Sequence, residues 1–398
     1  MFDQSLQTDY AGTRGPLFWL ALKTSTLTVL TLGIYRFWMK TRIRRYFWSA
    51  IRPGGIALEY SGTGVEKLMG FLVAVVVLAF YIGVFNLILM FLSFSLLNNN
   101  VVAYLASFVG LIPIYFYARY RARRYILART RWRGIRFGAE SAAWSYAWRA
   151  MLLWLATILS LGIYLPRQIF RLEKFRTDRT WYGQQKFCQT GNWKMLLRGA
   201  RHYYIGLGLT ITAGLGGFVN QSMLGLLVLS LPWLAIGFVH LRVTAFRRMT
   251  DAKRLGNDIG FCAHPRTGRV LGIYLLGYFL VGLCLVMSMV LLILIAVVVM
   301  VMLQSGALGY DSFGALFSGK GKSAEYLVYV GIALVYFGFF ILLGVLRQVF
   351  VTLPMLRHYA ETLEIRGGHH LATIRQRPRD EFSEAEGFAE ALDIGAAI

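Results

Sequence analysis

Long uncharged apolar runs constrain this sequence more than any other feature. Residues 68–97 and 270–303 contain no Asp, Glu, Lys, Arg or His, and about 20 apolar residues are enough for a helix to cross a bilayer. Similar runs occur at residues 101–117, 203–219, 223–239 and 326–346. Only 15% of all residues are charged, against about 25% in soluble domains. The sequence therefore predicts a multi-span membrane protein and excludes a soluble enzyme of ordinary composition.

The six runs pair into three expected helical hairpins. Polar residues separate the two members of each pair, at residues 98–100, 220–221 and 304–325. Two further apolar stretches, residues 16–35 and 147–166, each stand alone between basic segments. We expect these two to be re-entrant or interfacial, with eight full spans as the alternative. The expected fold class is an all-α polytopic membrane protein with about six transmembrane helices in three hairpins.

Basic residues gather in the segments between the apolar runs. The chain holds 42 Lys and Arg against 19 Asp and Glu, a formal net charge of +23. Loops rich in Lys and Arg stay in the cytoplasm, so we expect these segments and both termini to be cytoplasmic. The expected parts are a cytoplasmic N-terminus at residues 1–15, a repeated membrane domain at 16–379 and an acidic disordered tail at 380–398.

A short motif repeats along the chain and points to an internal repeat. Leu-Gly-Ile-Tyr occurs at residues 32–35, 161–164 and 271–274. After the first two copies come a basic, aromatic-rich segment and then a glycine with short alternation, at residues 55–62 and 183–191. Alternation of period two is typical of a β-strand. Because isolated strand pairs are marginally stable, we expect these short cytoplasmic strands to pair with one another.

The first copy of the repeat resembles a known bacterial family. The resemblance lies in the stretch from Phe18 to Gly62, in Thr31 with the Leu-Gly-Ile-Tyr motif, Phe37-Trp38, Arg44-Arg45-Tyr46-Phe47-Trp48 and Glu59-Tyr60-Ser61-Gly62. These residues resemble the YjgN-like family of bacterial inner-membrane proteins, a group of unknown function. The resemblance implies a multi-span protein of the bacterial cytoplasmic membrane, and it supplies no catalytic residues.

No arrangement of residues in the sequence indicates an enzyme. The longest runs lack the ionisable side chains that ion-coupled carriers place near the membrane midplane. Cys188, Cys262 and His264 are residue types that bind zinc, but their spacing matches no zinc motif, and buried thiols explain them equally well. We expect no catalytic residue, no cofactor and no metal. Nucleic acid is not an expected partner, because each basic cluster borders an apolar run.

The basic segments hold the candidate binding residues. Arg and Lys lay their stems along apolar surface and reach for phosphate with their head groups, and each contributes about 1 kcal/mol at an anionic membrane surface. The sequence predicts binding or transport of a lipid-like or anionic solute, with anionic membrane lipid as partner. The alternative is a non-enzymatic envelope scaffold or assembly partner, in which these residues only set topology. The candidates are Arg42, Arg44, Arg45, Arg121, Arg123, Arg124, Arg171, Lys174, Arg176, Arg247 and Arg248.

Overall fold

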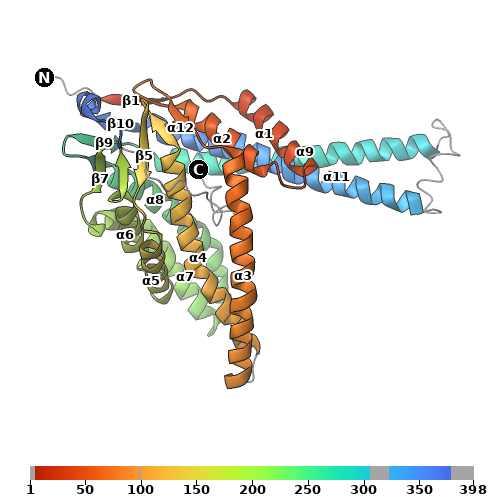
Figure 1. Cartoon of the computed structure of the whole chain (residues 1–398). Coiled ribbons are helices and arrows are strands. Elements are labelled where there is room, and N and C mark those ends of the chain that lie inside the picture. Colours follow the sequence, from red (N-terminus) through yellow and green to blue (C-terminus); the bar gives the residue numbers. More distant parts are fainter. Residues whose placement is uncertain (1–4, 98–99, 305–321, 378–398) are drawn as a thin grey trace. The chain divides into compact units, whose positions relative to one another are not determined.

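The chain forms two compact units in the computed structural model, which describes residues 5–97, 100–304 and 322–377 (Figure 1). The first unit comprises Met1–Gly12, Lys40–Leu271 and Arg357–Ile398, and the second comprises Thr13–Met39 and Gly272–Leu356. The expected acidic tail at residues 380–398 lies outside the described residues, as does most of the turns expected at 98–100 and 304–325.

The first unit is built around an antiparallel sheet of ten strands. The prediction of an all-α protein is therefore wrong. The predicted strand segments at residues 55–62 and 183–191 contain β3 and β7, but several other strands have only three residues and give little periodicity in the sequence. Such strands are stable only when they have neighbours. Their order is β2-β1-β10-β9-β8-β7-β6-β5-β4-β3, a near-closed ring in chain order with β1 joined to β10. The strands are β1 (Leu6–Tyr10), β2 (Ile51–Pro53), β3 (Leu58–Tyr60), β4 (Thr130–Trp132), β5 (Ile135–Ala139), β6 (Thr180–Tyr182), β7 (Gln185–Gln189), β8 (Lys253–Leu255), β9 (Ile259–Ala263) and β10 (Leu363–Arg366).

Helical segments alternate with strand pairs along the chain. Four times along the chain, two successive helices are followed by two strands. The two strands pair with each other in three of these units, whereas β2 and β3 lie at the two ends of the strand order. β10 pairs with β1, from the opposite end of the described chain. The repeated unit is thus two helices and two strands. The helices are α1 (Arg14–Leu30), α2 (Arg36–Ala50), α3 (Gly64–Leu97), α4 (Asn100–Ala128), α5 (Ala143–Leu159), α6 (Leu165–Thr177), α7 (Leu197–Gly217), α8 (Leu227–Asp251), α9 (Thr267–Gln304), α11 (Lys322–Arg347) and α12 (Leu353–Glu361).

The Leu-Gly-Ile-Tyr motif forms the same turn in its first two copies. Leu32 and Leu161 have φ angles of 51° and 50°, and both Gly33 and Gly162 have a φ of 92°. A positive φ is rare for a residue with a side chain, so its recurrence supports an internal repeat. Each turn joins an apolar helix to a basic one, α1 to α2 and α5 to α6. The third copy, at residues 271–274, lies inside α9 and forms no turn.

Side chains fill the inside of the ring. Tyr182 packs against the rings of Trp132 and Phe137, with centroid distances of 5.7 Å and 4.8 Å. The segment after β10 adds Leu371 and Ile374 to the same cluster. Its main chain is held in place because the amide of Gln184 donates to the carbonyl of Arg375 over 3.1 Å. In the described part of the chain, the ring is a packed core rather than a channel.

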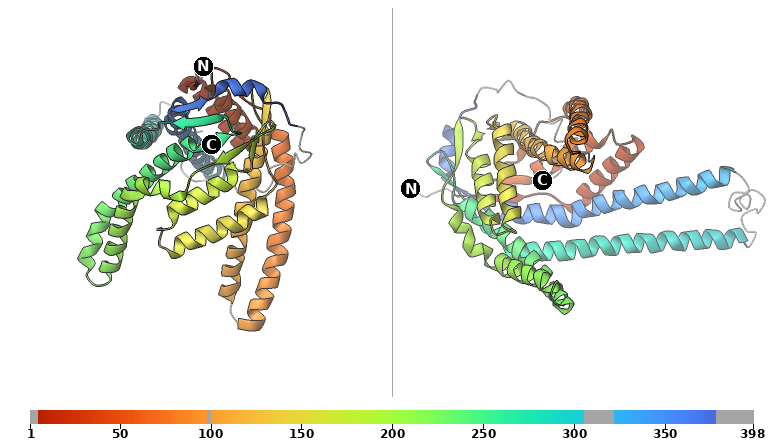
Figure 2. Two further views of the ribbon diagram at one scale, coloured as in Figure 1. Left: turned by 90° about the vertical axis from the view of Figure 1, so that its left-hand side faces the viewer. Right: turned by 90° about the horizontal axis from the view of Figure 1, so that it is seen from below.

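Four helices among the described residues are long and apolar enough to cross a membrane. Their side chains lie largely outward, as Phe80 and Phe91 of α3 do with 71% and 74% exposure. α3 packs against α4 and α7 against α8, and these helices extend away from the sheet (Figure 2). The runs at 101–117 and 203–219, also predicted to span, are not among the four. The four segments are Gly64–Leu92, Gln221–Asp251, Thr267–Ile295 and Ala333–Glu361.

Candidate functional site

Basic residues at one repeated position bind the helices to the sheet. Arg45, Arg124, Lys174 and Arg357 each lie six residues before the first strand of their unit. We call these four residues the tethers, because their charged groups bond to main-chain carbonyls. They explain part of the excess of basic residues in the sequence without any ligand. The tethers donate to the carbonyls of Gly62 (3.4 Å), Ala139 (3.2 Å), Gln189 (2.6 Å) and Gly12 (2.6 Å), respectively, each at or just beyond the end of the other strand of its unit (β3, β5, β7 and β1).

The remaining candidate residues have differing surroundings. Arg42, Arg171 and Arg247 are exposed on the helices that carry them. Arg123 and Arg176 both act on the carboxylate of Glu173, as described below. Three more bond to protein groups: Arg44 donates to the Tyr60 hydroxyl (3.2 Å), Arg121 to the Tyr117 hydroxyl (3.4 Å) and Arg248 to the Met195 carbonyl.

A pocket of about 360 Å³ opens between α4, α5, α6 and α8 of the first unit. Its lining has two chemical characters, one apolar and one charged. Cations outnumber acids in the charged part, so the pocket is electropositive. The apolar part includes Trp154, Leu165, Ile169, Leu172 and Phe246, and the charged part consists of Arg119, Arg176, Arg242, Lys253 and Glu173.

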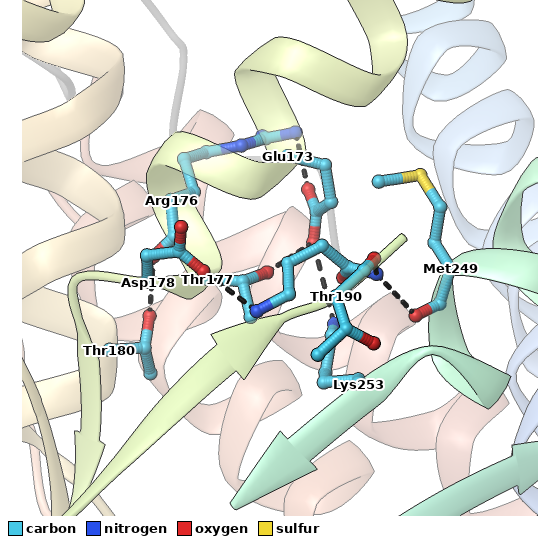
Figure 3. A network of polar contacts seen from close by, with 9 residues as sticks. Glu173, Arg176, Thr177, Asp178, Thr180, Thr190, Met249 and Lys253 are labelled. Carbon is cyan, nitrogen blue, oxygen red and sulfur yellow. Dashed lines mark hydrogen bonds and ion pairs between the residues drawn. The ribbon is translucent and has the colours of Figure 1, made fainter. Parts of the chain in front are cut away.

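Glu173 joins the charged side chains to one another (Figure 3). Its Oε2 atom accepts a bond from Nη2 of Arg176 over 2.6 Å, and its Oε1 atom lies 3.6 Å from Nζ of Lys253. The Thr177 hydroxyl donates to Oε1 over 3.4 Å. Burial raises the pKa of Glu173, but Arg176, Lys253 and Arg123 outweigh burial and hold the pKa well below its usual value. The carboxyl group is therefore ionised at neutral pH.

The cations around Glu173 outnumber its single carboxylate. Burial lowers the pKa of the Arg123 guanidinium and of the Lys253 amine, and Glu173 partly offsets that effect on both. The Nε atoms of Arg123 and Arg176 are buried and have no hydrogen-bond partner within the described residues. Buried donors without a partner are costly. Arg123 does not line the pocket, but Arg176 does, so the pocket has both charge and a donor for a further anion.

The sheet explains how residues distant in sequence meet in this pocket. α6 carries Glu173 and leads into β6 and β7, and β7 pairs with β8 so that Gln189 lies opposite Lys253. The sequence singled out Arg123 and Arg176 but not Glu173 or Lys253. An isolated acid within a basic helix is the signal that points to Glu173. No sequence signal points to Lys253, because a strand pairing brings it there.

The cysteine and histidine residues considered as metal ligands do not form a cluster. Cys262 is buried with its Sγ atom 3.3 Å from Nε2 of His264, whereas Cys188 is exposed. Within the described ranges, no three His, Cys, Asp or Glu side chains are placed to hold a metal ion.

Comparison with known proteins identifies a family but no function. A family model described as "Bacterial protein of unknown function (DUF898)" matches residues 5–285, from β1 into α9. The match confirms the family resemblance that we drew from the first Leu-Gly-Ile-Tyr copy and the residues around it. No curated protein and no solved structure matches the chain.

Proposed function

This chain belongs to that bacterial family of unknown function, and we propose that it is a cytoplasmic-membrane protein that binds an anionic, lipid-like molecule in the pocket between α4, α5, α6 and α8. The composition of the pocket carries the proposal. Four basic side chains and one carboxylate lie beside an apolar wall, and an amphiphile with a negatively charged head matches both parts.

Each part of the pocket suits one part of such a ligand. Arg and Lys side chains bind phosphate and carboxylate oxygens through charge-assisted hydrogen bonds. Burying an acyl chain against Trp154, Leu165 and Ile169 contributes about 25 cal/mol per Å² of apolar surface. A purely polar anion would leave the apolar wall unused, so we favour a lipid-like molecule over inorganic phosphate.

The position of the rim arginines supports a lipid in particular. Arg119 and Arg242 come just after the apolar runs 101–117 and 223–239, where basic side chains meet lipid head groups. The positive-inside rule assigns this end of the helices to the cytoplasmic face. We propose binding rather than passage through the sheet, because aromatic and aliphatic side chains fill the ring.

Native mass spectrometry of the detergent-purified protein tests the proposal. Phosphatidylglycerol or phosphatidylcholine is added, and the lipid retained by each protein is counted. The pocket variant carries Arg119→Gln and Arg242→Gln. The matched control carries Arg171→Gln and Arg247→Gln, which remove the same charge from exposed positions that do not line the pocket. We expect wild type and control to retain phosphatidylglycerol selectively and the pocket variant to lose it.

Two results would contradict the proposal. Equal loss in both variants would show that general surface charge, not the pocket, holds the lipid. If the wild-type protein retains no anionic lipid, anionic lipids are excluded as its ligand and the scaffold alternative is favoured.

A further inference from the structure

We propose that Glu173 is an internal counterion, which holds the cations of the pocket when no ligand is bound and yields them to the anionic group of the ligand. The inference rests on the proposed function, because it concerns the same pocket. It makes Glu173 a residue that sets affinity by competing with the ligand.

The contacts of Glu173 are those that a bound phosphate group would make. One oxygen takes the Arg176 guanidinium at 2.6 Å, and the other takes the Thr177 hydroxyl at 3.4 Å and faces Lys253 at 3.6 Å. Guanidinium, ammonium and hydroxyl groups are the usual side-chain donors to phosphate oxygens. Glu173 thus presents an oxyanion to this donor set from within the protein.

The donor set keeps capacity that Glu173 does not use. Arg176 binds Glu173 through Nη2 alone, and its buried Nε atom has no partner among the described residues. The charge of Arg123, which does not line the pocket, also acts on Glu173. A guanidinium binds an oxyanion most strongly when Nε and Nη2 both donate. An anion that engages both atoms of Arg176 would therefore displace the single bond to Glu173.

Asp178 on the same helical segment shows what a purely structural carboxylate looks like. Its oxygens accept the main-chain amide of Gln189 (2.7 Å) and face Nζ of the tether Lys174 (3.1 Å). It does not line the pocket. Its side chain is 30% exposed against 23% for Glu173, so the two acids differ in partners more than in solvent access. Asp178 is therefore a matched control.

A competing role and a structural role for Glu173 predict opposite signs. If Glu173 competes with the ligand, its neutralisation strengthens binding. If Glu173 only holds α6 to β8 and thereby shapes the pocket, its neutralisation weakens binding. The affinity of a Glu173→Gln variant separates the two roles.

The experiment titrates wild type, Glu173→Gln and Asp178→Asn with short-chain phosphatidylglycerol in mild detergent and measures the Kd by native mass spectrometry. We expect Glu173→Gln to bind about tenfold more tightly, the effect of removing one like charge beside a partly screened site, and Asp178→Asn to bind as wild type does. Equal or weaker binding by Glu173→Gln overturns the inference. A parallel titration with inorganic phosphate tells a lipid site from a general oxyanion site. At a lipid site, Glu173→Gln binds only the lipid more tightly than wild type does; at a general oxyanion site, it binds both the lipid and phosphate more tightly. Either result supports the competing role.

Glu173→Gln leaves buried cations without their carboxylate, and unpaired buried cations destabilise a protein. If this variant fails to fold, a second variant keeps the test valid. The double variant Glu173→Gln/Lys253→Gln removes the pair together. A competing Glu173 predicts lipid binding at least as tight as in wild type despite the lost lysine, and a structural Glu173 predicts weaker binding. If Arg119→Gln/Arg242→Gln abolishes lipid retention while Glu173→Gln changes nothing, the proposed function stands and this inference fails.

Discussion

Leu6 and Ile365 face each other across two neighbouring antiparallel strands, although they lie near opposite ends of the described chain. This pairing joins β1 to β10, and β1 also pairs with β2 on its other side. One short strand thus links the last repeated unit to the first. Without β1, the order of the sheet would be interrupted between β10 and β2.

Removal of β1 is expected to destabilise the first unit. Deleting residues 1–11 leaves β2 without its paired strand, leaves β10 paired only with β9, and removes the buried ring of Tyr10. Loss of one buried aromatic side chain alone costs about 3 kcal/mol, so we expect a clearly lower thermal unfolding midpoint by tryptophan fluorescence. Deleting residues 1–4 keeps the strand and serves as control. Equal midpoints for the two deletions would show that the pairing of Leu6 with Ile365 contributes little.

The two glycines of the Leu-Gly-Ile-Tyr turns are expected to differ in how much stability is lost when alanine replaces them. Gly33→Ala and Gly162→Ala both place a side chain at a φ of 92°, which costs about 1 kcal/mol or more. An added Cβ at Gly33 meets open space, whereas at Gly162 it comes within 2.5 Å of the Tyr203 hydroxyl. We expect the larger drop in unfolding midpoint for Gly162→Ala. Combining it with Tyr203→Phe should recover part of the loss; no recovery would assign the drop to backbone strain alone.

A tether is expected to contribute more stability than an exposed basic residue on the same helix. Lys174→Met removes the bond to the Gln189 carbonyl and the ion pair with Asp178, at a cost of about 1 kcal/mol for a partly exposed charged group. Arg171→Met removes one positive charge from an exposed position of α6 and is the control. Thermal unfolding in one detergent compares them. A loss of equal size in both variants would mean that net charge, not the tether, matters.

The acid sensitivity of the first unit is expected to depend on Glu173. Its pKa is lower in the folded protein than in an unfolded chain, so its contribution is fully present above about pH 4.3, the ordinary glutamate value, and is lost as pH falls further toward the folded pKa. Glu173→Gln should therefore lose less stability than wild type between neutral pH and pH 3. Thermal unfolding midpoints across this range measure the difference. Parallel curves would show that Glu173 is not a source of the acid sensitivity.

The sequence predicts the features of this protein that depend on local patterns. The apolar runs, the repeated Leu-Gly-Ile-Tyr motif and the family resemblance all follow from contiguous residues, whereas the turn that the motif forms is seen only in the structure. The sheet follows only in part. The alternation at residues 55–62 and 183–191 predicts strands where β3 and β7 lie, but strands of three residues such as Ile51–Pro53 and Thr180–Tyr182 are too short for period-two alternation to stand out. They persist because each strand gains partners far away in the chain.

The candidate site divides in the same way. A count of basic residues finds Arg123 and Arg176, but it equally selects Arg124 and Lys174, whose charges bond to strand carbonyls. Only the three-dimensional arrangement separates a tether from a pocket residue. Lys253 reaches Glu173 through the pairing of β7 with β8, and no local pattern around Lys253 reveals that contact.

The junction of β1 with β10 also imposes an order on biosynthesis. The ribosome makes β1 and β2 before β10, so these two strands can pair first. The opposite edge of β1 stays unpaired until residues 363–366 of β10 have been made. A waiting strand edge presents unpaired amides and carbonyls that invite association with other chains. A chain whose synthesis stops before β10 could insert its helices into the membrane and still expose this edge.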